Sequence, residues 1–282
     1  MDLLDEWLEE LIITDKKVEE ERLKMEAYLA LPTPVVDLIF VTCVYFEQPD
    51  EVRYLAVEVF DRFIRLHFED LQKKVWTKNE ISAQEHWKKV EKKLGTQTSL
   101  RMLSCIQVAS KFIIQPKVVK PKDIQKYLEL EGKNFKLSMI MASEIRVLNT
   151  LDFKLHFPTV FTNVGMLLEQ IWSSEHAHIL PKDVYQTALL LTDVVYLHHQ
   201  EIFCKLFYLM TGRWDVVPEE KQNFQKTECN MLYQAAAVVA LAVSFTSTDV
   251  DELIHRELSN LTNLSLGDIR GLVKIINQIV LS

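Results

Sequence analysis

Apolar residues recur three or four positions apart along most of this chain, which is the spacing of amphipathic helices. In the segment 52–66 the residues that share one helical face are Val52, Leu55, Val59, Phe63 and Leu66. Two longer segments, 100–114 and 230–245, are apolar on nearly all sides, as expected of helices in the centre of a core. The pattern therefore predicts an all-α protein in which two sets of about five helices each surround a buried central helix.

Prolines and polar breaks divide this pattern into three parts. Residues 1–30 form an acidic amphipathic stripe, which predicts a helical extension packed on the body; a free arm that binds a partner is the alternative. Residues 31–157 form the first helical domain, and residues 158–282 form a second domain with the same plan. Within the first domain, the run 34–46 is apolar on nearly all sides, so we expect a buried helix that begins at Pro34.

The stretch from about 69 to 98 differs from the rest of the first domain. It is rich in lysine and mixed in charge, with two isolated tryptophans, Trp76 and Trp87. Such composition is typical of a solvated helical insertion. A basic docking face for an acidic protein or a nucleic acid is the alternative.

Composition narrows the class of protein further. With 6 Gly and 8 Pro in 282 residues the chain is poor in turn formers, which favours long helices. The net charge of −8, without a basic tail, argues against direct binding of nucleic acid, which requires clustered Lys and Arg. The longest apolar run, 232–245, is shorter than the roughly 20 residues that cross a bilayer, so we expect a soluble protein without membrane contact.

Catalytic and metal-binding signatures are absent from the sequence. It holds no phosphate-binding glycine loop, nucleophile elbow or HExxH pair, and the adjacent His198 and His199 point to different helix faces. The cysteines are far apart in apolar runs, which predicts reduced core thiols: Cys43, Cys105, Cys204 and Cys229. We therefore expect a non-enzymatic protein without a metal ion or cofactor.

Three motifs in the first domain, in this order and spacing, resemble those of the cyclin family. They are LAVEVFDRFI at 55–64, LSCIQVASKF at 103–112, and Glu144 followed by IRVLNTLDFKLHFPT. The resemblance covers about residues 34–160 by motif and the remainder by helix order. It implies a cyclin box, a five-helix bundle around a central helix, followed by a second cyclin-like helical domain.

The resemblance also implies a binding site. In cyclins, a Lys and a Glu at the positions of Lys111 and Glu144 hold the mobile regulatory helix of a cyclin-dependent protein kinase. Neighbouring apolar residues would cover the apolar face of that helix, and here these are Val108, Phe112, Phe153 and Leu155. The alternative is an internal Lys111–Glu144 ion pair that contacts no partner.

Several positions depart from the usual family pattern. Ile113 and Ile114 replace two glutamates, and the substrate-docking positions carry Leu31, Pro32 and Leu38 instead of Met, Arg and Trp. Without that Arg, Asp61 lacks its usual family partner, which argues against docking of Arg-x-Leu substrates.

With these departures, the sequence resembles most the divergent cyclin N-terminal domain-containing proteins. This branch of the family is associated with meiotic crossover maturation in the nucleus. The implied function is a regulatory subunit that binds, and by extension activates, a cyclin-dependent kinase, with recombination proteins as further partners. One alternative is a scaffold at recombination sites that no longer activates a kinase. Another is a cyclin-fold transcription factor that binds nucleic acid, which the net charge and the lack of a zinc ribbon disfavour.

Overall fold

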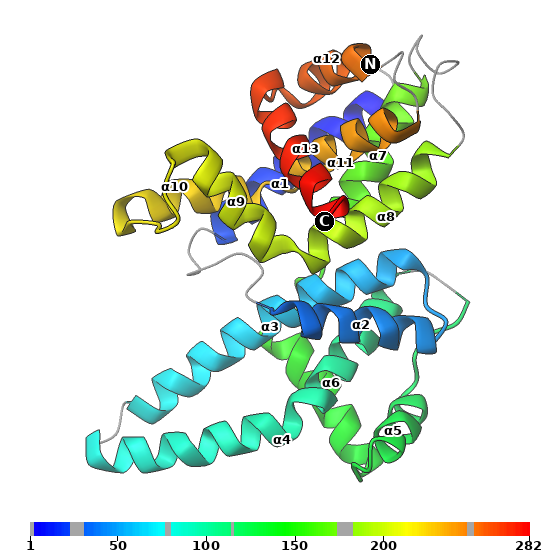
Figure 1. Ribbon diagram of the computed structural model, residues 1–282. Coiled ribbons are helices and arrows are strands. Elements are labelled where there is room, and N and C mark those ends of the chain that lie inside the picture. Colours follow the sequence, from blue (N-terminus) through cyan, green and yellow to red (C-terminus); the bar gives the residue numbers. More distant parts are fainter. Residues whose placement is uncertain (1–2, 23–30, 77–79, 114–115, 174–182, 247–250) are drawn as a thin grey trace. The chain divides into compact units, whose positions relative to one another are not determined.

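The computed structural model describes residues 3–22, 31–76, 80–113, 116–173, 183–246 and 251–282, and every regular element in these ranges is a helix (Figure 1). This confirms the all-α prediction. The chain forms two compact units. One contains residues 37–156, and the other combines residues 1–36 with 157–282. The boundary between residues 36 and 37 lies within the helix Thr33–Tyr45.

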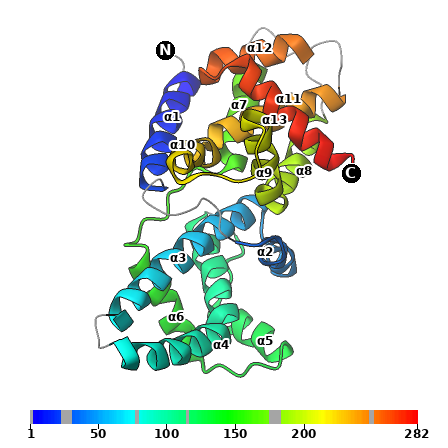
Figure 2. The same cartoon turned by 60° about the vertical axis from the view of Figure 1, so that its left-hand side comes forward.

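The unit 37–156 is a five-helix bundle around a central helix, as predicted. Its helices are α2 (Thr33–Tyr45), α3 (Asp50–Trp76), α4 (Glu80–Phe112), α5 (Pro121–Leu130) and α6 (Leu137–Thr150). Helix α4 contacts α3, α5 and α6, and residues 100–110 of α4 are all buried (Figure 2). The apolar run that contains the second cyclin-like motif is therefore the centre of this core.

Local sequence determines where the shorter helices begin and end. Helix α5 starts with Pro121, and the Asp123 carboxylate accepts a hydrogen bond from the backbone N–H of Lys120 at 2.9 Å. The same helix stops before Gly132, whose φ of +73° suits a residue without a Cβ. These signals explain where α5 begins and ends.

The stretch 69–98 is helical, as predicted, and most of its described residues are exposed or half-exposed. Helix α3 continues to Trp76 and α4 begins at Glu80, so the two helices extend as an antiparallel pair, drawn in cyan in Figure 1. We call residues 69–76 and 80–98 the arm. At its base Phe68 meets Trp87 edge to face, with ring centroids 5.1 Å apart. The basic docking face, the alternative for this stretch, stays a prediction.

Helix α2 lies at the edge of its bundle, so the prediction that it is buried on nearly all sides is wrong. The residues that face the core follow helical spacing: Val36, Ile39, Phe40 and Cys43. The opposite side exposes Leu38, Val41, Val44 and Tyr45 to solvent. Apolar composition alone did not distinguish an edge helix with an apolar outer face from a central one.

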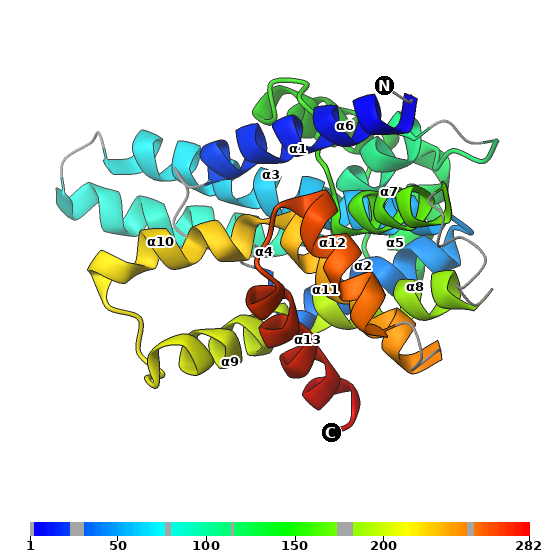
Figure 3. The same ribbon diagram turned by 90° about the horizontal axis from the view of Figure 1, so that it is seen from above.

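The other unit has the same plan around α11 (Met231–Thr246). Residues 231–243 are all buried, and α11 packs mainly against helices of the same unit that lie around it (Figure 3). These are α7 (Val160–Ser173), α8 (Val184–Leu197), α12 (Asp251–Thr262) and α13 (Leu266–Val280). Five alanines in α11 let these neighbours approach closely. The predicted second helical domain around its own central helix is thereby confirmed.

Three further helices complete this unit. They are α1 (Leu3–Arg22), α9 (His199–Thr211) and α10 (Pro218–Cys229). Helix α1 packs on α7, α10 and α11, as the packed alternative for the N-terminal extension predicts. Ser265 caps α13, because its hydroxyl accepts a hydrogen bond from the Asp268 N–H at 3.0 Å.

The buried-thiol prediction holds for three of the four cysteines. Cys43, Cys105 and Cys229 are buried, whereas Cys204 is exposed on α9. As to membranes, no single helix in the described ranges is both long and apolar enough to cross a bilayer. One strongly bent pair, Asn223–Cys229 with Met231–Thr246, reaches that length and composition together.

Candidate functional site

Lys111 and Glu144 lie side by side, although 33 positions separate them in sequence. Lys111 is in the last turn of α4 and Glu144 is near the middle of α6; the Lys111 Nζ donates to the Glu144 Oε1 at 2.5 Å. The lysine side chain is 43% exposed and the glutamate side chain 15%. In the isolated chain the two form an ion pair at the surface, which a visiting group can reach from the lysine side.

A buried polar cluster fixes the crossing of α4 and α6 behind this pair. The Arg101 Nη1 donates to the Ser143 Oγ at 2.6 Å, and the Ser104 Oγ donates to the same oxygen at 2.7 Å. Ser143 is the residue directly before Glu144, so these bonds set the position of the glutamate. We did not predict this cluster; the signal for it was two serines at positions of the apolar pattern that should face the core.

The two aromatic residues that we expected on this surface are exposed. Phe112 follows Lys111 and is 42% exposed, and Phe153 is 65% exposed. Leu155 is half-buried. Val108, which we expected on the same surface, is 2% exposed and belongs to the core of the bundle. It supports α4 from within and cannot cover a partner's apolar face.

The backbone after α6 holds Phe153 outward in an unusual conformation. Asp152 and Phe153 have φ values of +53° and +57°, although neither is glycine. Left-handed backbone is disfavoured for a bulky residue and occurs where the surroundings impose it. Here the Phe153 N–H donates to the Leu148 carbonyl at 2.9 Å and closes the helix end. The backbone of Phe153 is thus held in an unfavourable conformation, although its side chain is exposed to solvent in the isolated chain.

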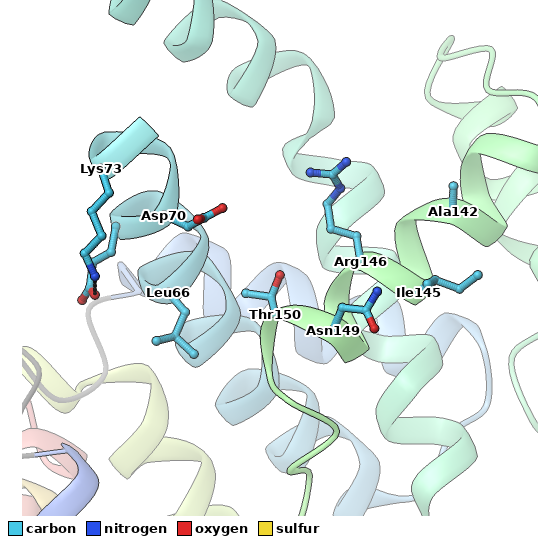
Figure 4. A pocket seen from close by; sticks show the side chains of 9 residues that line it. Leu66, Asp70, Lys73, Ala142, Ile145, Arg146, Asn149 and Thr150 are labelled. Atoms are coloured by element: carbon cyan, nitrogen blue, oxygen red, sulfur yellow. Dashed lines mark ion pairs between the residues drawn. The ribbon is translucent and has the colours of Figure 1, made fainter. Parts of the chain in front are cut away.

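Helix α6 also exposes apolar side chains to solvent. Three of its residues are about half exposed: Met139, Met141 and Ile145. Ile145 also lines a cavity of about 660 Å³ between α3 and α6, with Leu66 and Thr150 on its walls (Figure 4). Met and Ile side chains on an exposed helix are typical of a surface that another protein covers.

The positions that depart from the family pattern have their own surroundings. Asp61 is 2% exposed and forms an ion pair with Arg65, one turn later on α3. The aspartate therefore has a cation partner from its own helix in place of the missing family arginine. At the docking positions Leu31 is buried, while Pro32 and Leu38 are exposed. Ile113 is half-buried and Ile114 lies outside the described residues.

No metal centre can be assembled from the part of the chain that the structure describes. Within it, no three His, Cys, Asp or Glu side chains lie close enough to hold a metal ion. His198 instead lies 3.4 Å from the Glu201 carboxylate, on the neighbouring turn.

Comparison with known proteins agrees with the architecture. The family described as "Cyclin, N-terminal domain" matches residues 17–156. The human protein named Cyclin N-terminal domain-containing protein 1 is 23% identical over 238 residues, which is 83% of this chain and 72% of that protein. The mouse protein of the same name is 23% identical over 236 residues, which is 83% of this chain and 70% of that protein. The match thus extends well beyond the N-terminal domain.

Proposed function

Because this chain is a divergent member of the cyclin family, we propose that it is a regulatory subunit that binds a cyclin-dependent protein kinase. The observation that carries the proposal is the meeting of Lys111 and Glu144, with Phe112 and Phe153 exposed at the ends of the same two helices. Such a surface combines charged hydrogen-bonding groups with apolar area, which is what the docking of an amphipathic helix requires.

The partner's helix would exchange contacts with the internal ion pair. The Lys111 ammonium has three donors and can hydrogen-bond a backbone carbonyl, while the Glu144 carboxylate can accept from backbone N–H groups. Phe112 and Phe153 would cover the apolar face of the same helix. A kinase is activated in this way when the surface binds the active position of its helix more tightly than the inactive one.

The wider setting of the proposal follows from the resemblance to the divergent branch. We propose a non-catalytic role in meiotic crossover maturation in the nucleus, together with recombination proteins. Immunofluorescence on meiotic chromosome spreads tests this part, because we expect foci at crossover sites. A diffuse cytoplasmic signal in the same cells would contradict it.

A second candidate is a scaffold that kept the fold without kinase binding. Two observations favour it: Lys111 and Glu144 already satisfy each other, and Ile113 stands where typical cyclins have an acidic residue. An exposed ion pair is worth about 0–1 kcal/mol, however, so opening it would cost a partner little. The internal ion pair is thus no obstacle to a partner, and the exposed rings of Phe112 and Phe153 favour kinase binding over the scaffold.

A pull-down separates the two candidates. The full chain is immobilised and incubated with purified members of a panel of cyclin-dependent kinases, in parallel with Lys111→Ala/Glu144→Ala. We expect the wild type to retain a kinase and the double variant to lose it. The matched control is Arg213→Ala/Glu220→Ala, which removes another exposed ion pair, of 2.7 Å, in the other unit and should bind like the wild type. Retention of no kinase by the wild type would favour the scaffold.

A further inference from the structure

We propose that a basic cavity between α3, α4 and α6 binds a phosphate group carried on a serine or threonine side chain of a partner protein. The cavity measures about 200 Å³ and lies at the base of the arm. Its polar lining residues are His67, Lys93, Gln97, Arg101 and Arg146. The inference does not depend on kinase binding, because it concerns other residues than Lys111 and Glu144.

The cavity brings together three cations from two helices without a matching acid. Lys93 and Arg101 come from α4 and Arg146 from α6, the His67 imidazole lines the space from α3, and no carboxylate lines it. Within the described residues, neither arginine has a carboxylate at ion-pair distance. Like charges held this close repel each other, so an anion that entered would be attracted by all of them.

Arg101 is the most informative of these residues. It is 8% exposed, and burial of a guanidinium without an anion is costly. Ser143 and Gln97 accept hydrogen bonds from it at 2.6 and 3.0 Å, which leaves further N–H donors of the guanidinium for a ligand. Burial, followed by the charge of Arg146, lowers the pKa of Arg101, as expected of a cation without a counter-charge.

His67 reports the same excess of positive charge. It is stacked on Phe63 at 5.1 Å, and burial is the main reason that its pKa is lowered. Arg101, Arg146 and Lys74 lower this pKa further, and Asp70 opposes them. The cations thus outweigh the nearest acid at the imidazole.

Asp70 is the acid that could compete with a ligand. Figure 4 shows its carboxylate and the Arg146 guanidinium extending toward each other across the neighbouring cavity between α3 and α6. The aspartate is already bound to Lys74, with the Lys74 Nζ and Asp70 Oδ2 2.5 Å apart, and it is half exposed. A phosphate carries about 1.5 to 2 negative charges near neutral pH, so it would compete well for Arg146.

The size and walls of the cavity favour a single phosphate on a protein side chain. Guanidinium groups match phosphate in planar, two-point geometry. The apolar lining residues Leu71, Val90 and Leu94 would contact the carbon atoms next to the phosphate. A nucleic-acid backbone would need a long basic track instead, and the chain as a whole carries a net charge of −8.

Fluorescence anisotropy with the full-length protein tests the proposal. The probes are labelled degenerate peptide pools with one fixed phosphoserine or phosphothreonine, the same pools with serine or threonine, and a labelled single-stranded DNA. The variants are Arg146→Gln and Lys93→Gln, both at exposed positions where folding should be unaffected. The matched control is Arg256→Gln, an exposed arginine in the other unit.

We expect the phosphorylated pools to bind at least tenfold more tightly than the unphosphorylated ones. Arg146→Gln and Lys93→Gln should each weaken this binding about tenfold or more, as the loss of a charge-assisted hydrogen bond does, and Arg256→Gln should leave it unchanged. Equal affinity for both kinds of pool, or wild-type affinity in Arg146→Gln, would overturn the proposal. Tighter binding of the DNA than of the phosphorylated pools would overturn it in favour of a nucleic-acid site.

Discussion

Removal of the Ser143 hydroxyl should loosen the crossing of α4 and α6 more than the loss of one surface group would. In Ser143→Ala the buried Arg101 Nη1 loses its acceptor at 2.6 Å, and Ser104 loses one partner but keeps the Leu100 carbonyl at 2.8 Å. A hydrogen bond to a charged group contributes about 1.5–3 kcal/mol, and an unsatisfied buried donor adds its desolvation cost. We therefore expect the free energy of unfolding to fall by about 2 kcal/mol.

Urea denaturation followed by circular dichroism measures this change, and a thermal scan should show Tm lower by roughly 5 °C. Ser138→Ala is the matched control, because Ser138 is exposed on the same helix and its loss should change stability by less than about 0.5 kcal/mol. If Ser143→Ala is as stable as Ser138→Ala, the buried cluster does not hold the two helices, and our explanation of how Glu144 is positioned fails.

The remaining predictions concern the backbone and the thiols. Gly212→Ala should lower the free energy of unfolding by about 1 kcal/mol, because Gly212 caps α9 with a φ of +70°. Gly95→Ala should raise the free energy of unfolding by about 0.5–1 kcal/mol, because Gly95 lies inside α4 with no neighbour near its Cβ position. Urea titrations of the two variants check both values. Cys204 should react first with a thiol reagent in the native protein, since the other three cysteines are buried, and mass spectrometry of the labelled peptides would show this. Burial raises the pKa of Cys43 from 9.0 to about 12, so between these pH values the Cys43 thiol is deprotonated in the unfolded chain and protonated in the folded one. The free energy of unfolding should therefore fall as the pH rises through this window. In Cys43→Ala this fall should be smaller.

The fold could be predicted from the sequence because apolar spacing and helix punctuation agree along most of the chain. Pro121 and Gly132 are local signals that bound one helix, and the fully apolar segments lie in the central helices α4 and α11. An error arose where composition outweighed spacing: the apolar outer face of α2 was taken for a second buried face.

The candidate site was only partly accessible to the same reasoning. The family motifs place Lys111 and Glu144 in the right helices, and the structure brings them together, but their contact with a kinase stays a prediction. Val108 was misplaced because a motif gives the order of residues and not which side of a helix faces the core. Arg101 was missed for two reasons. Its partner Ser143 lies on α6 and comes close only where α6 crosses α4. Its partner Gln97 lies one turn earlier, in a part of α4 that precedes the predicted central helix.

The central claim is that Lys111 and Glu144 serve a partner and not only each other, and a charge swap tests it most directly. In Lys111→Glu/Glu144→Lys an internal ion pair can still form, so the free energy of unfolding should stay within about 0.5 kcal/mol of the wild type. The hydrogen-bonding groups offered to a visiting helix are reversed, so affinity for the kinase that the wild type binds, measured by calorimetry, should fall at least tenfold, as expected when charge-assisted hydrogen bonds are lost. Wild-type affinity in the swapped protein would contradict the claim and leave the pair a purely structural one.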